Sequence, residues 1–329
     1  MFDLSKLKTF GLDIGSHSVK LVQLERRGPG FCALAAACVC IAQAQDESEQ
    51  RKNILAAIAA CLSQSGVKSS AAVGGINGAE ALVRNFRFGA MPPEELEQAI
   101  RFEAIQFCPF ELDQGTIDYK MLSPTAADQG GVAVAETTLR GVMVASANKA
   151  IKARRQLILD ANLDCILLDA DSLALYNCLT ELRRPAEGHC LVLVNIGHRA
   201  TSVVIAPDGG LPFIRELSSG GNDIQASLAE GAEPAEASRK LLGDVNETIR
   251  YYKAQEGLAP VEEILICGGY ALADNFLELV RSQFHEPAAW WNPFERLDRE
   301  SRAPGKELMD ESGPALAVAA GLAMRCTQE

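Results

Sequence analysis

The chain has 329 residues, of which 48% are hydrophobic and 22% charged, and it carries a formal net charge of −12 with a pI near 5.0. This length suits about two domains of ordinary size, and the composition can bury a sizeable core. The acidic balance excludes a general nucleic-acid-binding surface, so no nucleic-acid partner is expected.

Cysteine usage and hydropathy bear on the compartment. Ten cysteines are scattered along the chain with no CxxC pair, and most lie in apolar runs such as CALAAACVCIA. Free cysteines of this kind indicate a reducing cytoplasm and no metal site of their own. The first residues lack the layout of a signal peptide, and the longest apolar runs are shorter than the ~18–20 residues of a membrane-spanning helix. We therefore expect a cytoplasmic protein that inserts no segment directly into a membrane.

Hydrophobic periodicity predicts alternating strands and helices through the first half of the chain. Strands are expected at 9–14, 18–25, 32–41, 71–76 and 81–88, with a helix at 49–64. The segment PPEELEQAIRFEAIQFCPF begins with two prolines and ends near Pro109, which predicts a helix over 94–107. A strand, a helix and a strand then follow at 139–146, 149–162 and 165–169. We expect the stretch at about 85–170 to form a small β-α-β subdomain inserted in the first domain.

The second half of the chain repeats the opening pattern. The segment HCLVLVNIGHRATSVVIA aligns with LKTFGLDIGSHSVKLVQL, which places Asp13 opposite Asn195 and Gly15 opposite Gly197. A PDGG hairpin, two helical segments, the strand EEILICGG and a final apolar helix follow. Two halves that open in the same way predict two similar α/β domains that face a common cleft.

The first turn, DIGSHS (Asp13–Ser18), has the composition of a phosphate-binding loop. Glycine lets backbone N–H groups approach an anion, Ser16 and Ser18 add hydroxyl donors, and Lys20 adds a positive charge. An aspartate is poorly placed against phosphate alone, so Asp13 implies a cation between them, for which Mg²⁺ is the natural choice. An ordinary tight hairpin with an acid at its mouth is the alternative.

Three further turns are candidates for the rest of the site. The second turn, NIGHRAT (Asn195–Thr201), occupies the matching place in the other half. The third turn, SSGGND (Ser218–Asp223), leads into a helix N-terminus that favours phosphate, unless Asn222 or Asp223 only caps the helix. The fourth turn, LICGGYALADN (Leu265–Asn275), breaks a buried strand at two glycines, where backbone could approach an adenosine. No Walker A sequence is present, so the chain is not a P-loop protein.

These four turns, in this order, resemble the actin-like ATPase superfamily. Within it, the chain is most similar to the PilM family, the cytoplasmic actin-like proteins of the type IV pilus assembly platform. The similar segments include GLDIGSHSVKLVQL, RELSSGGNDIQASLAE, ILICGGYALADNF, WNPFERL and PALAVAAGLAMR, and they cover nearly the whole chain. The segment EAIQFCPF is the most specific of them, because phosphate turns are shared across the superfamily.

The resemblance implies an α/β, two-lobed actin-like ATPase fold of duplicated ribonuclease H-like domains, with an FtsA-like inserted subdomain. The first lobe would span 1–170, including the insertion at about 85–170. The second lobe would span 171–311, with a shortened helical subdomain at about 221–259. The C-terminal helix, 312–329, would return to the first lobe.

The same resemblance implies ATP and Mg²⁺ as cofactors, bound between the lobes, with Asp13 on the metal. The residues expected around the nucleotide are Asp13, Gly15, Ser16, Ser18, Lys20, Asn195, Gly197, Arg199, Thr201, Gly220, Gly221, Asn222, Gly268 and Gly269. Asn195 departs from the family, which usually carries an acid there to orient the attacking water. Catalytic residues therefore stay unassigned, and at most a weak ATPase is expected.

Partners follow from the resemblance as well. PilM proteins are understood to bind the short cytoplasmic tail of PilN, a membrane-anchored protein, in a groove that involves the inserted subdomain. This implies a PilN-type tail and other pilus platform proteins as partners, attachment to the inner membrane through the partner, and self-association as an open question. The expected contact residues are Glu103, Phe107, Pro109, Phe110 and Glu111. Simple packing of Phe107, Pro109 and Phe110 onto the first lobe is the alternative.

The leading hypothesis is an ATP-binding scaffold, in which nucleotide sets the angle between lobes that hold a partner peptide. A small-molecule kinase of the superfamily is one alternative, but it needs a catalytic acid where Asn195 stands. An FtsA-like filament-forming membrane tether is another, and it calls for an amphipathic helix that the final residues, LAMRCTQE, do not provide.

Overall fold

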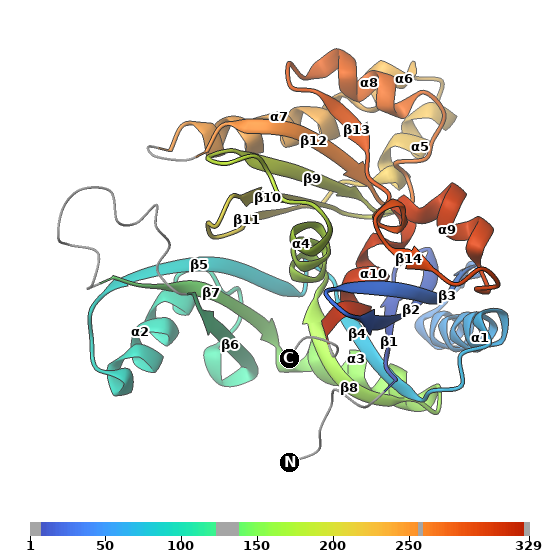
Figure 1. Ribbon diagram of the computed structural model, residues 1–329, viewed down its shortest axis with the longest axis horizontal. Helices are drawn as coiled ribbons and strands as arrows, with labels where there is room; N and C mark the ends of the chain where they lie inside the picture. The colour runs from blue at the N-terminus through green and yellow to red at the C-terminus, as the bar shows by residue number, and fades with distance from the viewer. Residues whose placement is uncertain (1–7, 123–137, 256–258, 326–329) are drawn as a thin grey trace.

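The computed structural model describes residues 8–122, 138–255 and 259–325 and folds them into two lobes, each built on one β-sheet (Figure 1). Two helices lie between the sheets, α4 (Asp171–Leu182) and α10 (Ala317–Met324). Alanine, leucine and glycine dominate α10, and all eight of its residues are buried. The largest buried apolar cluster joins these two helices to both sheets, so the lobes share one core.

The first sheet has six strands in the order β14-β3-β2-β1-β4-β8. They are β1 (Phe10–Ile14), β2 (Ser18–Arg27), β3 (Gly30–Cys40), β4 (Ala71–Ile76), β8 (Asp164–Ala170) and β14 (Asp298–Arg299). The first three form an antiparallel meander, and β4 runs parallel to β1 as β8 does to β4. Phe10 and Leu12 face the outer side, where α1 (Glu47–Ser65) and α3 (Asn148–Asp160) cover them.

The second sheet has five strands in the order β11-β10-β9-β12-β13. They are β9 (Cys190–Ile196), β10 (Thr201–Pro207), β11 (Phe213–Leu217), β12 (Val261–Cys267) and β13 (Ala288–Trp290). The helices of this lobe are α5 (Gly221–Ala229), α6 (Pro234–Ala237), α7 (Arg239–Lys253) and α8 (Phe276–Gln283). Apolar residues of α7 such as Leu241, Val245 and Ile249 follow helical spacing, and they pack against the outer face of the sheet.

The two sheets repeat one topology. The order β3-β2-β1-β4-β8 in the first sheet corresponds strand by strand to β11-β10-β9-β12-β13 in the second. Each begins with an antiparallel meander and continues with two strands parallel to the first. The internal duplication read from the sequence is therefore present in the backbone. The strand β14 and the helix α9 (Lys306–Ser312) that follows it lie outside the repeat.

A separate three-stranded sheet, in the order β5-β7-β6, lies beside the first lobe (Figure 1). It consists of β5 (Ala81–Gly89), β6 (Gly115–Met121) and β7 (Thr138–Ala147), with α2 (Pro93–Ile105) packed on it. From the sequence, the inserted subdomain was expected to extend to about residue 170. In the structure, α3 packs on β4 and β8, and β8 pairs with β4, so these two elements belong to the first sheet and the separate sheet ends at Ala147.

Two further properties concern the part of the chain that the structure describes. None of its helices combines the length and the apolarity that crossing a bilayer requires. Its nine cysteines are free thiols, and five of them are buried, at Cys32, Cys61, Cys178, Cys190 and Cys267.

The packing of α10 on β1 gives a stability prediction. A Cβ atom at Gly11 would overlap the carbonyl oxygen of Ala319 and lie 2.6 Å from the amide nitrogen of Ala323, both in the α10 backbone. We expect Gly11→Ala to lower the free energy of unfolding by about 1–3 kcal/mol, because backbone cannot yield as a flexible side chain does. Gly30→Ala is the matched control, since a Cβ there meets no atom within 4 Å. Denaturant titration that finds the two variants equally stable would contradict this account of the packing.

Candidate functional site

The first turn connects β1 to β2 at the edge of the first lobe that faces the second. The backbone N–H of Gly15 donates to the carbonyl of Ser18 at 3.1 Å, which closes the turn. A Cβ on Gly15 would sit 3.1 Å from that same oxygen, closer than most side chains tolerate. Ser16 and His17 at the tip are exposed, whereas Ser18 is already part of the buried strand β2.

The second turn has the same construction. The N–H of Gly197 donates to the carbonyl of Ala200 at 3.0 Å, and a Cβ on Gly197 would lie 2.9 Å from that oxygen. The two turns meet tip to tip, because the ring centroids of His17 and His198 are 4.8 Å apart. Burial is the main factor that lowers the pKa of His198, and the nearby His17 lowers it further. The equivalent turns of the two halves thus face each other across the lobe boundary.

The third turn supports the second turn through its backbone. The N–H of Gly221 donates to the carbonyl of Gly197, and the N–H of Asn222 donates to that of His198, each at 2.8 Å. These donors at the start of α5 were expected to point at a phosphate. In the structure they are used within the protein, and they fix the shape of the second turn.

Neighbouring groups of the same region are also engaged. The N–H of Gly220 donates to the carboxylate of Asp223 at 2.8 Å, which caps α5 as the alternative interpretation of this turn allowed. The buried hydroxyl of Thr201 donates to the carbonyl of Ser219 at 2.9 Å. Thr201 therefore connects the second turn to the third and is not directed outward.

The fourth turn lies against the end of β9. Gly268 has a φ of +96°, and a Cβ there would overlap the carbonyl oxygen of Ile196, so only glycine fits. Gly269 faces open space, since a Cβ would meet no atom within 4 Å. The ring of Tyr270 covers Gly221, where a Cβ would overlap it. All four predicted turns therefore form one contiguous group.

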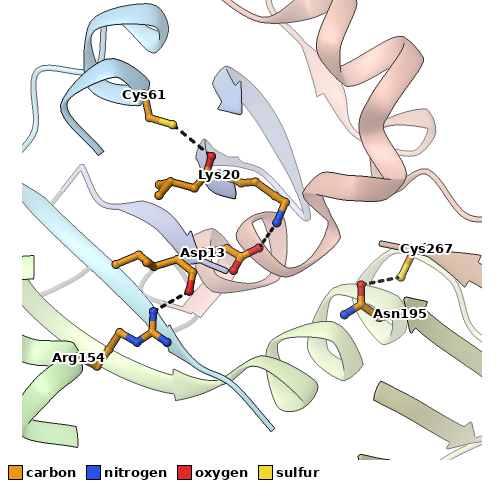
Figure 2. Close-up of polar contacts among 8 residues, drawn as sticks. Asp13, Lys20, Cys61, Arg154, Asn195 and Cys267 are labelled. Atoms are coloured by element: carbon orange, nitrogen blue, oxygen red, sulfur yellow. Dashed lines mark hydrogen bonds and ion pairs between the residues drawn. The ribbon is translucent and has the colours of Figure 1, made fainter. Parts of the chain in front are cut away.

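Asp13 and Lys20, expected on a metal and a phosphate, bind each other in this structure (Figure 2). They are opposite each other on β1 and β2, and Lys20 Nζ donates to Asp13 Oδ2 at 2.9 Å. Burial alone would lower the pKa of Lys20, but the Asp13 carboxylate outweighs it and raises that pKa above its usual value. The pair gives each charge a partner where neither is well solvated.

Sequence reasoning missed two acids, Asp171 and Glu216, and Asp171 interacts electrostatically with both Asp13 and Glu216. Asp171, the first residue of α4, has a buried Oδ1 atom without a hydrogen-bond partner. Burial and the repulsion of Asp13 raise its pKa to about 8, with a further contribution from Glu216 and opposition from Arg154 and Lys20. An acid directly after the buried strand CILLDA was a signal that could have identified it, because the ends of parallel strands commonly carry site residues.

Glu216 is the second of these acids, and it shares a row of side chains with Asn195. On neighbouring strands, Asn195 is opposite Ser202 and Ser202 is opposite Glu216, so all three face one side of the sheet. Ser202 Oγ donates to Glu216 at 2.8 Å, and burial raises the pKa of Glu216. Asn195 lies across α4 from Asp13 and accepts a long contact of 3.7 Å from Cys267 Sγ (Figure 2). The lobe thus carries a carboxylate, although not at position 195.

A cavity of about 630 Å³ opens beside the first turn. Gly15 and Ser16 line it, together with Arg199 from the second turn and Arg154 from α3. The start of α1 and the segment after β4 complete its wall with Ala44, Gln45, Asp46, Glu47, Gln50, Arg51, Ile54, Asn77 and Glu80. Of the residues predicted around the nucleotide, only Gly15, Ser16 and Arg199 line this cavity, and Asp13 and Lys20 do not.

The residues present fit a nucleotide phosphate with a hydrated divalent cation. Gly15 and Ser16 offer an exposed turn, and Arg154 and Arg199 bring positive charge to the same cavity. Asp171, whose buried Oδ1 atom has no hydrogen-bond partner, does not line this cavity. Among the described residues, no three His, Cys, Asp or Glu side chains gather to chelate a metal directly.

The expected partner residues lie on and after α2. Phe107 packs into the core of the three-stranded sheet, with the Arg84 guanidinium 5.5 Å from its ring centroid. Phe110 covers Gly115, whereas Pro109 and Glu111 are exposed and Glu103 is partly exposed.

Two apolar residues of α2 were not among the expected contacts. Phe102 and Ile105 are 68% and 58% exposed, and they stand on the outer face of the helix. Their positions relative to the buried Leu96 and Ile100 were a readable signal, because helical periodicity separates the two faces.

The pKa of Asp171 gives a pH prediction. In the unfolded chain this carboxyl ionises near pH 4, whereas in the folded protein it keeps its proton up to about pH 8. Its contribution to stability is therefore present below about pH 4 and is lost as the pH rises toward 8. We expect Asp171→Asn to flatten this fall, so the variant gains stability relative to wild type between about pH 5 and pH 8.

Denaturant unfolding at several pH values measures the effect, with the exposed Asp113→Asn as control. Parallel pH profiles for wild type and Asp171→Asn would show that the carboxyl is ordinary.

Comparison with known proteins supports the fold and the family. The chain resembles a solved structure, the PilM-PilN type IV pilus biogenesis complex, with a TM-score of 0.81 at 21% identity over 98% of this chain and 100% of that one. It also resembles the ethanolamine utilization protein EutJ from Carboxydothermus hydrogenoformans, with a TM-score of 0.51 at 14% identity over 96% and 88% of the two chains. These likenesses show an actin-like ATPase fold. The family model of type IV pilus assembly protein PilM matches residues 11–240 and 235–327, and the chain therefore belongs to the PilM family.

Proposed function

We propose that this protein is a cytoplasmic ATP-binding scaffold of the inner-membrane platform that assembles type IV pili, and that it holds the N-terminal tail of a PilN-type membrane protein. Membership of the PilM family supports the pathway. The solved structure that the chain resembles is a complex of PilM with PilN, which supports this class of partner. Attachment to the inner membrane would then come from the partner.

One structural observation carries the nucleotide part of the proposal. The two equivalent glycine turns come from different lobes and meet at the His17–His198 contact. A phosphate chain bound to both turns would touch both lobes at once, so its presence would set the angle between them. Such a device converts nucleotide binding into a change of shape without requiring turnover, because binding energy alone shifts the population of lobe angles.

The cofactors proposed are ATP and Mg²⁺. The first turn would hold the terminal phosphates through backbone N–H groups and Ser16, and a hydrated Mg²⁺ would link them to Asp13. Lys20 already neutralises Asp13, so the cation would share that carboxylate with it. Asn195, an amide in place of an acid, supports a scaffold with weak or no ATPase activity.

The partner surface proposed lies on the inserted sheet and α2. The strand β6 pairs only with β7 among the described strands, so its other edge offers backbone groups to an added strand. Glu103 and Glu111 give this region negative charge, which suits a tail with basic residues and mainly speeds their encounter.

Nucleotide binding should depend on the first turn. We expect Asp13→Ala and Gly15→Val each to weaken binding of ATP with Mg²⁺ by at least about 100-fold, since one removes the carboxylate and the other places a branched side chain where phosphate approaches. Calorimetric titration measures the affinity. Gly89→Val is the control for Gly15→Val, because a Cβ at Gly89 meets no atom within 4 Å.

Thermal melting separates binding from folding, since Asp13→Ala leaves the buried Lys20 without its partner. Wild-type affinity in both folded variants would remove the first turn from the site.

Partner binding should depend on α2. We expect Glu103→Lys to weaken binding of a PilN-type tail peptide by about tenfold at low salt, because it reverses a charge beside the proposed surface. Glu307→Lys makes an equal change of net charge at an exposed position of α9, outside the inserted sheet and α2. This control variant should leave binding unchanged. Fluorescence anisotropy with a labelled peptide makes the comparison. If Glu103→Lys binds as wild type does, the tail is seated elsewhere.

A further inference from the structure

Arg154 has an anchored but incompletely used guanidinium beside the first turn. Its Nη1 atom donates to the carbonyl oxygen of Ile14 at 2.8 Å, and Ile14 directly precedes Gly15 (Figure 2). Within the described ranges, no carboxylate lies within 4.0 Å of this guanidinium. Arg51, which lines the same cavity, is in contrast ion-paired with Asp160.

Arg154 lines the cavity beside the first turn, the turn that is proposed to hold the terminal phosphates. Gly15 and Ser16 of the first turn and Arg199 of the second turn line the same cavity as Arg154. Positive charge therefore reaches the space beside the first turn from both lobes.

Three acids also line the cavity, Asp46, Glu47 and Glu80. Asp46 caps α1 by accepting the N–H of Glu49 at 2.8 Å, and Glu80 accepts from Asn77 at 2.7 Å. Glu47, exposed in the first turn of α1, is the remaining acid of the wall. Besides the ion-paired Arg51, the cations of this wall are Arg154 and Arg199.

We propose that Arg154 recognises the terminal phosphate of a bound nucleoside triphosphate and so distinguishes ATP from ADP. The inference rests on the proposed function, because it names the residue by which that nucleotide site reads its ligand. One N–H bond to Ile14 holds the guanidinium in place while its remaining donors stay available, and a planar fork of donors matches the geometry of a phosphate. A pre-anchored arginine loses less freedom on binding than a free one.

The helix that carries Arg154 is also connected directly to the inserted sheet. Arg154 lies on α3, and α3 begins at Asn148 immediately after β7 of the inserted sheet. The hydroxyl of Thr116 on β6 donates to the Asn148 side chain at 2.7 Å, which fixes the start of the helix to that sheet. A displacement of Arg154 on phosphate binding would therefore be transmitted through α3 to the inserted sheet, which is proposed to hold the partner.

Calorimetric titration of the full-length protein with ADP and with a non-hydrolysable ATP analogue, both with Mg²⁺, tests the proposal. We expect Arg154→Ala to weaken binding of the ATP analogue by about 10- to 100-fold while changing ADP affinity by less than about threefold, the scale of a lost charge-assisted contact. The neighbouring Arg155→Ala, an exposed residue of the same helix, should change neither affinity.

The outcomes separate this inference from the proposed function. Equal losses for both nucleotides would overturn it, because they would show that Arg154 only shapes the turn through Ile14, and unchanged affinities would overturn it as well. Failure of the wild-type protein to bind either nucleotide would refute the proposed function itself. If Arg154→Ala does not unfold cooperatively, Arg154→Gln, which keeps an N–H donor for Ile14, makes the same comparison.

Discussion

The geometry of the whole molecule depends on how closely α10 approaches its neighbours. Gly11 on β1 lets the α10 backbone reach the first sheet, and Gly321 on α10 lets it reach the carbonyl of Ala174 on α4. Backbone meets backbone at both points, and no side chain larger than hydrogen fits. These two contacts set how far apart the sheets lie. The first turn follows the central strand β1 and the second turn follows the central strand β9. The separation of the two sheets therefore also determines that these turns meet.

The lobe boundary is also where the protein concentrates buried charge. Asp13, Asp171 and Glu216 supply acidic groups, and Lys20 and Arg154 supply positive charges. The raised pKa of Asp171 and that of Glu216 show that this compensation is incomplete, so protons remain where a cation would otherwise be favoured. This mixture of acidic and cationic groups is compatible with the metal-nucleotide complex proposed above.

Local patterns predicted much of this, and long-range contacts account for what they did not predict. The glycine turns were identifiable because each combines a buried strand with residues that suit a tight turn, and Gly15 and Gly197 indeed make the same backbone bond. The β-α-β pattern that ends at 170 looked like one unit in sequence. The strands β4 and β8 pair although the whole inserted sheet separates them in sequence, so no local stretch of sequence reveals the pairing.

The same distinction explains the site residues. The sequence around Gly221 and Asn222 has the composition of a phosphate site. The N–H groups of these two residues instead donate to carbonyl groups of the second turn, which only the tertiary fold brings within reach. Arg154 stands in a run, KARRQ, whose cations look like an ordinary solvated helix face. Nothing in that run separates Arg154 from Arg155, because the separation comes from the position of Ile14 in another element.

The position of α10 has a consequence for how the protein is made. The ribosome releases β1 and β2 first and α10 last, so the inner face of the first sheet stays uncovered while almost the entire chain is synthesised. The core of the first lobe can therefore close only after α10 has been made, unlike that of a domain whose elements are contiguous in sequence. A variant cut just before α10 would leave open the apolar face of β1 and β2 that α10 covers.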